Sequence, residues 1–136
     1  MAAIGFKIRT ERTKEGGGSL ARILIVDDEP DIRFMMRLIF EKAGHKVTEA
    51  RHGATGLNSV KSSPPDLVIT DVMMPTMDGL EFIERMRSDP QTSAIPILVV
   101  SGNSDLAASA NTRLTKPFLA RDLLDAVARL IGENDG

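Results

Sequence analysis

The chain has 136 residues, a formal charge of -2 and 4% aromatic residues, the profile of one ordinary globular domain without the basic surface that nucleic acids require. It contains no cysteine, which excludes disulfides, thiolate metal sites and cysteine nucleophiles. No apolar run approaches the roughly 20 residues of a membrane span, and the N-terminus lacks the apolar core of a secretory signal. We therefore expect a cytoplasmic protein with neither nucleic-acid nor membrane partners.

The first part of the chain is a polar extension that ends in a flexible linker. The linker is GGGS at residues 16–19, so we expect an extension over 1–19 and a folded domain over 20–133. Ile4, Phe6 and Ile8 alternate as they would in a strand, and the extension would then dock on the domain or on another protomer. The alternative is disorder, which is usual for charged, glycine-terminated tails.

From Leu20 onward, short apolar runs alternate with helical repeats. In chain order we expect a strand at 22–26, a helix beginning at Pro30, a strand at 46–50, a helix at 53–63, a strand at 66–70, a helix containing Leu80 and Ile83, a strand at 95–100, a short strand at 113–115 and a final helix containing Leu119, Leu123, Val127 and Leu130. Uniformly apolar strands that alternate with helices predict an α/β fold, with a parallel sheet covered on both faces.

The core is expected to include the apolar repeat of the first helix and most of the methionines. The repeat consists of Ile32, Met35, Met36, Ile39 and Ala43. We interpret Met35, Met36, Met73, Met74 and Met86 as core-filling side chains and not as a soft-metal site.

Polar residues follow four of the expected strands, at the edge where open α/β sheets bind ligands. They are Asp27, Asp28 and Glu29 after the first strand, Asp71 after the third, Ser101 after the fourth, and Lys116 and Pro117 after the fifth. If the first and third strands are neighbours, three carboxylates converge on one lysine, and a divalent cation would neutralise them. Oxygen ligands alone favour Mg²⁺, with Mn²⁺ also compatible.

A cation beside a lysine and a hydroxyl is suited to phosphoryl chemistry. Asp71 would be the carboxylate nucleophile that accepts the phosphoryl group, and Lys116 and Ser101 would steady it. We interpret Glu29 as a first-turn acid favoured by the helix dipole and not as a ligand. Asp78 is interpreted as a helix cap, and no role is assigned to His45 or His52.

Four motifs in this order give the chain a resemblance to a known family. VDDEP, DVMMPTMDG, VVSG and LTKPF each stand at the end of a predicted strand. Over about residues 21–131 the chain resembles the receiver domain of two-component response regulators. The resemblance implies a flavodoxin-like, doubly wound sheet of five parallel strands in the order 2-1-3-4-5, with helices on both faces.

The resemblance also implies a role for each matching residue. Asp71 matches the phosphoacceptor, and Asp28 and Asp71 match the acidic metal ligands. Asp27 matches the acid that acts mainly through ordered water, and Met73 would offer its backbone carbonyl to Mg²⁺. Ser101 matches the hydroxyl and Lys116 the ammonium that contact the phosphoryl group. The Lys116–Pro117 bond is expected to be cis, and the phosphodonor to be a histidine kinase or a histidine phosphotransfer protein.

The sequence departs from the family between Ser101 and Lys116. That interval is about seven residues shorter than is usual, roughly two helical turns, so we expect the fourth helix to be short or absent. Arg113 replaces the switching Tyr or Phe three residues before Lys116. Both changes fall on the surface that most relatives use for signalling or dimerisation, which leaves the downstream protein target and the oligomeric state open.

We interpret the chain as a single-domain response regulator that takes a phosphoryl group on Asp71, signals by a conformational change or by phosphorelay, and is not an enzyme in its own right. A non-phosphorylated pseudo-receiver with a constitutive binding surface is the alternative. A haloacid-dehalogenase-type phosphatase needs a second acid two residues after the nucleophile, where this chain has Met73. A flavodoxin-like electron carrier would need a flavin-phosphate loop that the sequence lacks.

Overall fold

The computed structural model describes residues 20–71, 79–101 and 112–135. These ranges contain five strands and four helices. The elements are β1 (Arg22–Val26), α1 (Pro30–Lys42), β2 (Lys46–Ala50), α2 (Gly53–Ser62), β3 (Leu67–Thr70), α3 (Gly79–Ser88), β4 (Ile97–Ser101), β5 (Thr112–Thr115) and α4 (Ala120–Asp135). The predicted shortening of a helix after Ser101 falls on residues 102–111, which lie outside the described residues, as do the extension, Met73 and Asp78.

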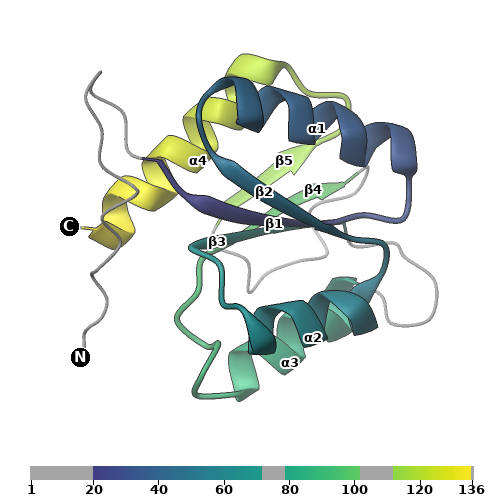
Figure 1. The fold of residues 1–136 in the computed structure, drawn as a ribbon, viewed down its shortest axis with the longest axis vertical. Helices are drawn as coiled ribbons and strands as arrows, with labels where there is room; N and C mark the ends of the chain where they lie inside the picture. Colours follow the sequence, from purple (N-terminus) through teal and green to yellow (C-terminus); the bar gives the residue numbers. More distant parts are fainter. Residues whose placement is uncertain (1–19, 72–78, 102–111, 136) are drawn as a thin grey trace.

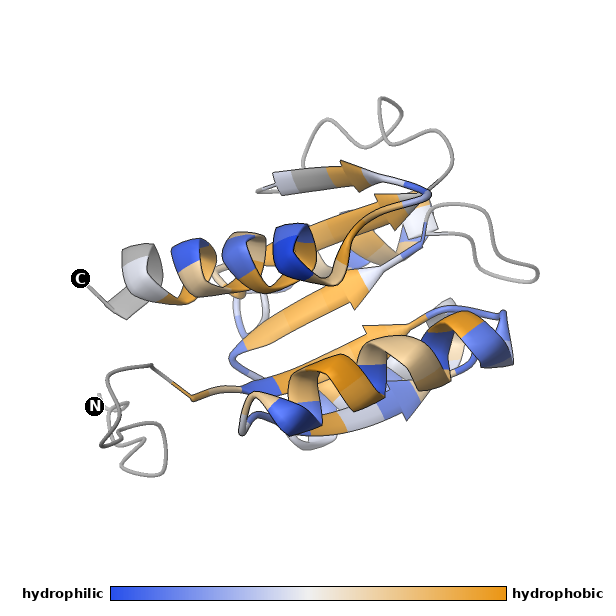
Figure 2. Ribbon diagram, turned by 90° about the horizontal axis from the view of Figure 1, so that it is seen from above, coloured by the Kyte–Doolittle hydropathy of each residue, from blue (hydrophilic) through white to orange (hydrophobic). Residues whose placement is uncertain are grey.

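The strands form one parallel sheet in the order β2-β1-β3-β4-β5, as the resemblance implies. Figure 1 shows the sheet between two pairs of helices, with α1 and α4 on one face and α2 and α3 on the other. The four strands β1, β3, β4 and β2 contain only one to three polar residues each, and Figure 2 shows the central strands as the most hydrophobic part of the ribbon. The predicted α/β class is confirmed.

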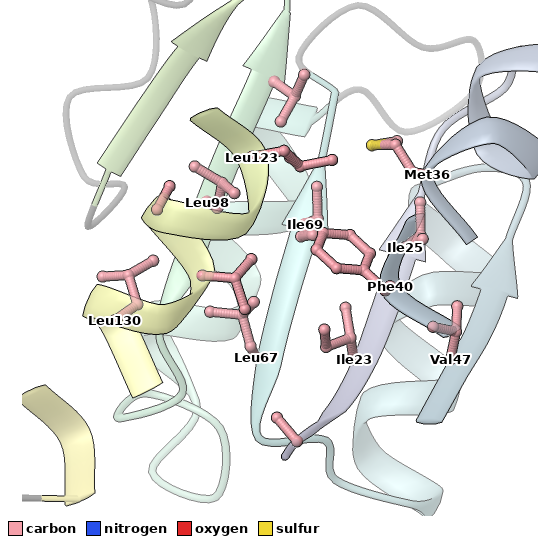
Figure 3. Packing of buried hydrophobic residues seen from close by; sticks show 14 of the residues in the cluster. Ile23, Ile25, Met36, Phe40, Val47, Leu67, Ile69, Leu98, Leu123 and Leu130 are labelled. Carbon is pink, nitrogen blue, oxygen red and sulfur yellow. The ribbon is translucent and has the colours of Figure 1, made fainter. Parts of the chain in front are cut away.

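The larger cluster of buried side chains lies between the sheet and the pair α1 and α4. Phe40 is fully buried there, among Ile23, Ile25 and Ile69 (Figure 3). The sequence prediction did not include Phe40, although it follows the buried Met36 by one helical turn. The Phe40 ring is therefore a large buried side chain of α1 that the predicted apolar repeat did not include.

Two residues of the first-helix repeat, which was predicted to face the core, are exposed. Met35 is 39% exposed and Ala43 is also exposed, so the prediction was wrong for both. Met35 neighbours the buried Met36, and two consecutive helical positions diverge by about 100° and cannot both face the sheet. Leu119, which was expected in the final helix, precedes the first residue of α4 and is 57% exposed.

The close packing of α2 against the sheet requires a glycine. A Cβ atom on Gly56 would lie 3.0 Å from Val26 Cγ2 and 3.3 Å from Phe82 Cε1. Gly56 thus lets α2 approach the end of β1 and the side of α3, which compensates for its poor helix propensity. The helix, in turn, covers the part of β1 that leads into the polar strand end.

Candidate functional site

The register of the central strands places two acids side by side. Val26 is paired with Thr70, so Asp27 and Asp71 are the next residues on neighbouring parallel strands. The backbone continues this alignment past the strands, because the Asp71 N–H donates to the Val26 carbonyl at 3.0 Å. The first and third strands are therefore neighbours, and the condition for converging carboxylates is met.

Three of the predicted metal-ligating residues come together at this edge. Carboxylate oxygens of Asp27, Asp28 and Asp71 lie within 4.8 Å of one another. Asp27 and Asp71 are buried, at 1% and 6% exposure, whereas Asp28 is exposed. Carboxylate oxygens are hard ligands, so the donor set fits Mg²⁺ or Mn²⁺. Met73, the fourth predicted ligand, lies outside the described residues.

Lys116 reaches the acids from the loop that follows β5. Its Nζ lies 3.1 Å from Asp71 Oδ2 and 3.4 Å from Asp27 Oδ2. It also lies 3.0 Å from Glu29 Oε1. The Lys116–Pro117 peptide bond is cis, as the resemblance implies. One ammonium is thus shared among three carboxylates.

Glu29 is the site residue that the sequence analysis misjudged. The residue is the N-cap of α1, and its side chain pairs with Lys116, so the interpretation as a first-turn acid was incomplete. Asp31, two residues later, is the acid of the first turn. The long side chain beside the Asp27–Asp28 pair was the available signal, since a glutamate there can reach a neighbouring loop.

The electrostatics of the cluster are unbalanced. Among the described residues the cluster has four carboxylates and the ammonium of Lys116, a formal charge of -3 when all are ionised; the carboxylates are those of Asp27, Asp28, Glu29 and Asp71. Burial raises the pKa of Asp27 above its ordinary 3.8, and the Asp71 charge adds to this, against a hydrogen bond from the Glu29 N–H and the Lys116 charge. Burial alone would lower the pKa of Lys116, but its hydrogen bonds and ion pairs with Glu29, Asp27 and Asp71 raise it above its ordinary value.

Two further predicted residues are placed only by their backbone. Ser101 ends β4 and is paired with Thr115, the residue before Lys116, so it stands at the same sheet edge. Arg113 lies within β5, where it is paired with Val99. Their side chains lie outside what the structure describes.

Comparison with known proteins agrees with this geometry. A model of the response regulator receiver domain matches residues 23–128. The chain belongs to the response regulator receiver family. Protein PilH of Pseudomonas aeruginosa is 33% identical over 115 residues, which cover 79% of this chain and 95% of PilH. Sporulation initiation phosphotransferase F of Bacillus subtilis is 32% identical over 115 residues, covering 81% of this chain and 93% of the relative.

Solved receiver domains share the fold and one of them holds the expected metal. The receiver domain of sensor histidine kinase PA1611 from Pseudomonas aeruginosa has a TM-score of 0.79 and 25% identity, covering 84% of this chain and 99% of that chain. It was solved with a magnesium ion coordinated in its active-site cleft. Other curated relatives are longer, and the chain spans about half of their length. None of the described helices is long and apolar enough to cross a membrane.

Proposed function

We propose that this receiver domain accepts a phosphoryl group on Asp71 in a Mg²⁺-dependent reaction and works as a phosphorylation-controlled switch or relay intermediate. The observation that carries the proposal is the contact of Lys116 Nζ with Asp71 Oδ2 at 3.1 Å, within a cluster of three carboxylates that has the chemistry of a hard-cation site. Within the acidic cluster, Asp71 makes the shorter contact with the ammonium, at 3.1 Å against 3.4 Å for Asp27. It is therefore the best placed nucleophile of the described residues.

The residues at this edge of the sheet would have different roles in the reaction. Asp27, Asp28 and Asp71 would hold the cation, with Met73 as a further ligand through its backbone. When bound, Mg²⁺ supplies positive charge that offsets the charge of the phosphoryl oxygens. Lys116 is held at the nucleophile by its ion pairs, so that its ammonium is in place to pair with those oxygens. Ser101, at the end of β4, would supply the hydroxyl.

The phosphodonor is proposed to be a histidine kinase or a histidine phosphotransfer protein. Exposed apolar side chains occur on the two segments that follow site residues: Phe34 on α1 is 59% exposed, Leu38 one turn later is 45% exposed, and Leu119 is 57% exposed three residues after Lys116. Exposed apolar residues on segments that also carry site residues favour a protein partner. Phe34→Glu should slow transfer from a protein donor and leave phosphorylation by acetyl phosphate unchanged.

Intact-mass analysis after incubation with acetyl phosphate tests the acceptor directly. A single phosphoryl adduct should form in the presence of Mg²⁺, and neither EDTA-treated protein nor the Asp71→Asn variant should carry it. No adduct on a folded protein that binds Mg²⁺ would overturn the proposal and favour the pseudo-receiver. An adduct that persists in Asp71→Asn would place the acceptor elsewhere.

A further inference from the structure

The shortest ion pair of Lys116 is made to Glu29, an acid outside the three-carboxylate cluster. The Lys116 Nζ to Glu29 Oε1 distance is 3.0 Å, against 3.1 Å to Asp71 and 3.4 Å to Asp27. The two aspartate side chains are at most 8% exposed, whereas the Glu29 side chain is 58% exposed. Lys116 therefore makes competing ion pairs, with two buried aspartates and with one exposed glutamate.

The backbone of Glu29 is fixed by the site itself. Its N–H donates to Asp27 Oδ1 at 2.9 Å, and its carbonyl accepts the Arg33 N–H at 3.0 Å as the first hydrogen bond of α1. The side chain must span from α1 to the loop after β5 to reach Lys116. Since the backbone is anchored, the position of the carboxylate depends on the length of this side chain.

We propose that Glu29 is a positioning residue that holds Lys116 in the resting site and has to release it when Asp71 is phosphorylated. The inference rests on the proposed function. A phosphoryl group adds about -1.5 to -2 of charge and three strong acceptor oxygens beside Lys116. The ammonium then has a better partner than Glu29, and the charge of Glu29 repels the same group. Glu29 thus favours the unphosphorylated state.

The inference predicts opposite effects on two ligands of one site. Glu29→Gln removes a negative charge near the cation ligands and frees Lys116 to turn towards Asp27 and Asp71, so Mg²⁺ should bind about twofold more weakly. Beryllofluoride, an anionic mimic of a phosphoryl group on a carboxylate, should bind about two- to fivefold more tightly at saturating Mg²⁺, the range of a partly exposed ion pair. A loss of helix capping alone would not change the two affinities in opposite directions.

Two further variants distinguish the effect of the Glu29–Lys116 contact from the effect of the negative charge alone. Asp31→Asn removes the same charge in the first turn of α1, where Asp31 is exposed and makes no ion pair with another described residue, so both affinities should stay unchanged. Glu29→Asp keeps the charge and shortens the reach. It should behave like Glu29→Gln towards beryllofluoride. If it behaves like the wild type, or if Asp31→Asn reproduces Glu29→Gln, the positioning role is refuted.

The first experiment titrates Mg²⁺ and then beryllofluoride into the four proteins by calorimetry. A second readout is the side-chain NMR signal of Lys116 in metal-free protein, which Glu29→Gln should shift and Asp31→Asn should not. A wild type that binds no beryllofluoride refutes the proposed function, and the Lys116 signal still tests the contact. A wild type that binds it with the same affinity as Glu29→Gln refutes only this inference.

Discussion

Replacing Asp27 by asparagine should stabilise the metal-free domain. Asp27 is 1% exposed, and its carboxylate lies within 4.8 Å of those of Asp71 and Asp28. At an effective dielectric constant of about 20, the repulsion from the buried Asp71 is at least about 3.5 kcal/mol, and that from the exposed Asp28 is about 1 kcal/mol after screening by water. The attraction between Asp27 and Lys116, whose charged atoms lie 3.4 Å apart, offsets this repulsion by about 5 kcal/mol.

These charge terms nearly cancel, which leaves the cost of burying the carboxylate itself. That cost is several kcal/mol, offset by about 1.5 to 3 kcal/mol from the hydrogen bond that the Glu29 N–H donates to Asp27 Oδ1. An asparagine oxygen can still accept that bond. We therefore expect Asp27→Asn to raise the free energy of unfolding at pH 7 by about 1 to 2 kcal/mol, and the Tm by about 5 °C.

The pH dependence gives the sign of this prediction a separate check. Burial raises the pKa of Asp27 in the folded protein above its ordinary value of 3.8. The contribution of Asp27 to folding stability is therefore fully present below pH 3.8 and is lost as the pH rises through the raised pKa. The variant should thus be more stable than the wild type at pH 7, and this difference in stability should shrink as the pH falls towards 4.

Thermal unfolding in EDTA and in Mg²⁺, at several pH values, is the assay. In EDTA at pH 7 the variant should unfold at the higher temperature. Added Mg²⁺ should raise the Tm of the wild type more than that of the variant, because ligand binding stabilises only a fold that holds the ligand. A variant that is less stable than the wild type in EDTA would refute the electrostatic reasoning.

Three other substitutions test different parts of the structure. Of the residues that the structure describes, Lys116 is the one whose ammonium pairs with these acids, so Lys116→Met should lower stability in EDTA by about 3 kcal/mol and tighten Mg²⁺ binding in calorimetry. Weaker Mg²⁺ binding would contradict the charge balance. Burial lowers the pKa of His45, whose Nδ1 accepts the Ala21 N–H at 2.9 Å, so wild-type stability should fall as the pH drops through 6.5. His45→Gln should flatten that dependence in urea unfolding between pH 7.5 and 5, and an unchanged slope would assign it to another group. Phe40→Ala should cost about 3 to 5 kcal/mol in urea unfolding because the ring is fully buried, and a loss below about 2 kcal/mol would show that the core collapses around the cavity.

The sequence predicted the fold well because its signals are local and repeated. The runs at 22–26 and 46–50 correspond to β1 and β2 without a shift. The strand expected at 95–100 instead covers Ile97–Ser101, since Ile95 and Pro96 are apolar residues of the preceding loop and Ser101 is a polar residue of the strand. An apolar run marks a buried segment, but it does not mark where hydrogen bonding to the next strand begins.

The sequence predicted which residues form the site, and the structure adds how they interact. Residues at strand ends converge in any parallel sheet, so Asp27, Asp71 and Lys116 were accessible from pattern alone. Glu29 was not, because an acid near the start of a helix has a sufficient explanation in the helix dipole. Only the position of the loop after β5 shows that its side chain reaches Lys116.

The same contacts account for the proposed order of events, in which the site would bind a cation and then receive a phosphoryl group. Among the described residues, four carboxylates and one ammonium leave excess negative charge, which should favour Mg²⁺ binding and make the metal-free fold less stable than it would otherwise be. Once a cation offsets that charge, the position of the Lys116 ammonium should decide how strongly the site binds the phosphoryl group. Because Glu29 competes for Lys116 from the exposed side of the site, a change at this one surface residue should shift the balance between the two states without altering the buried acids.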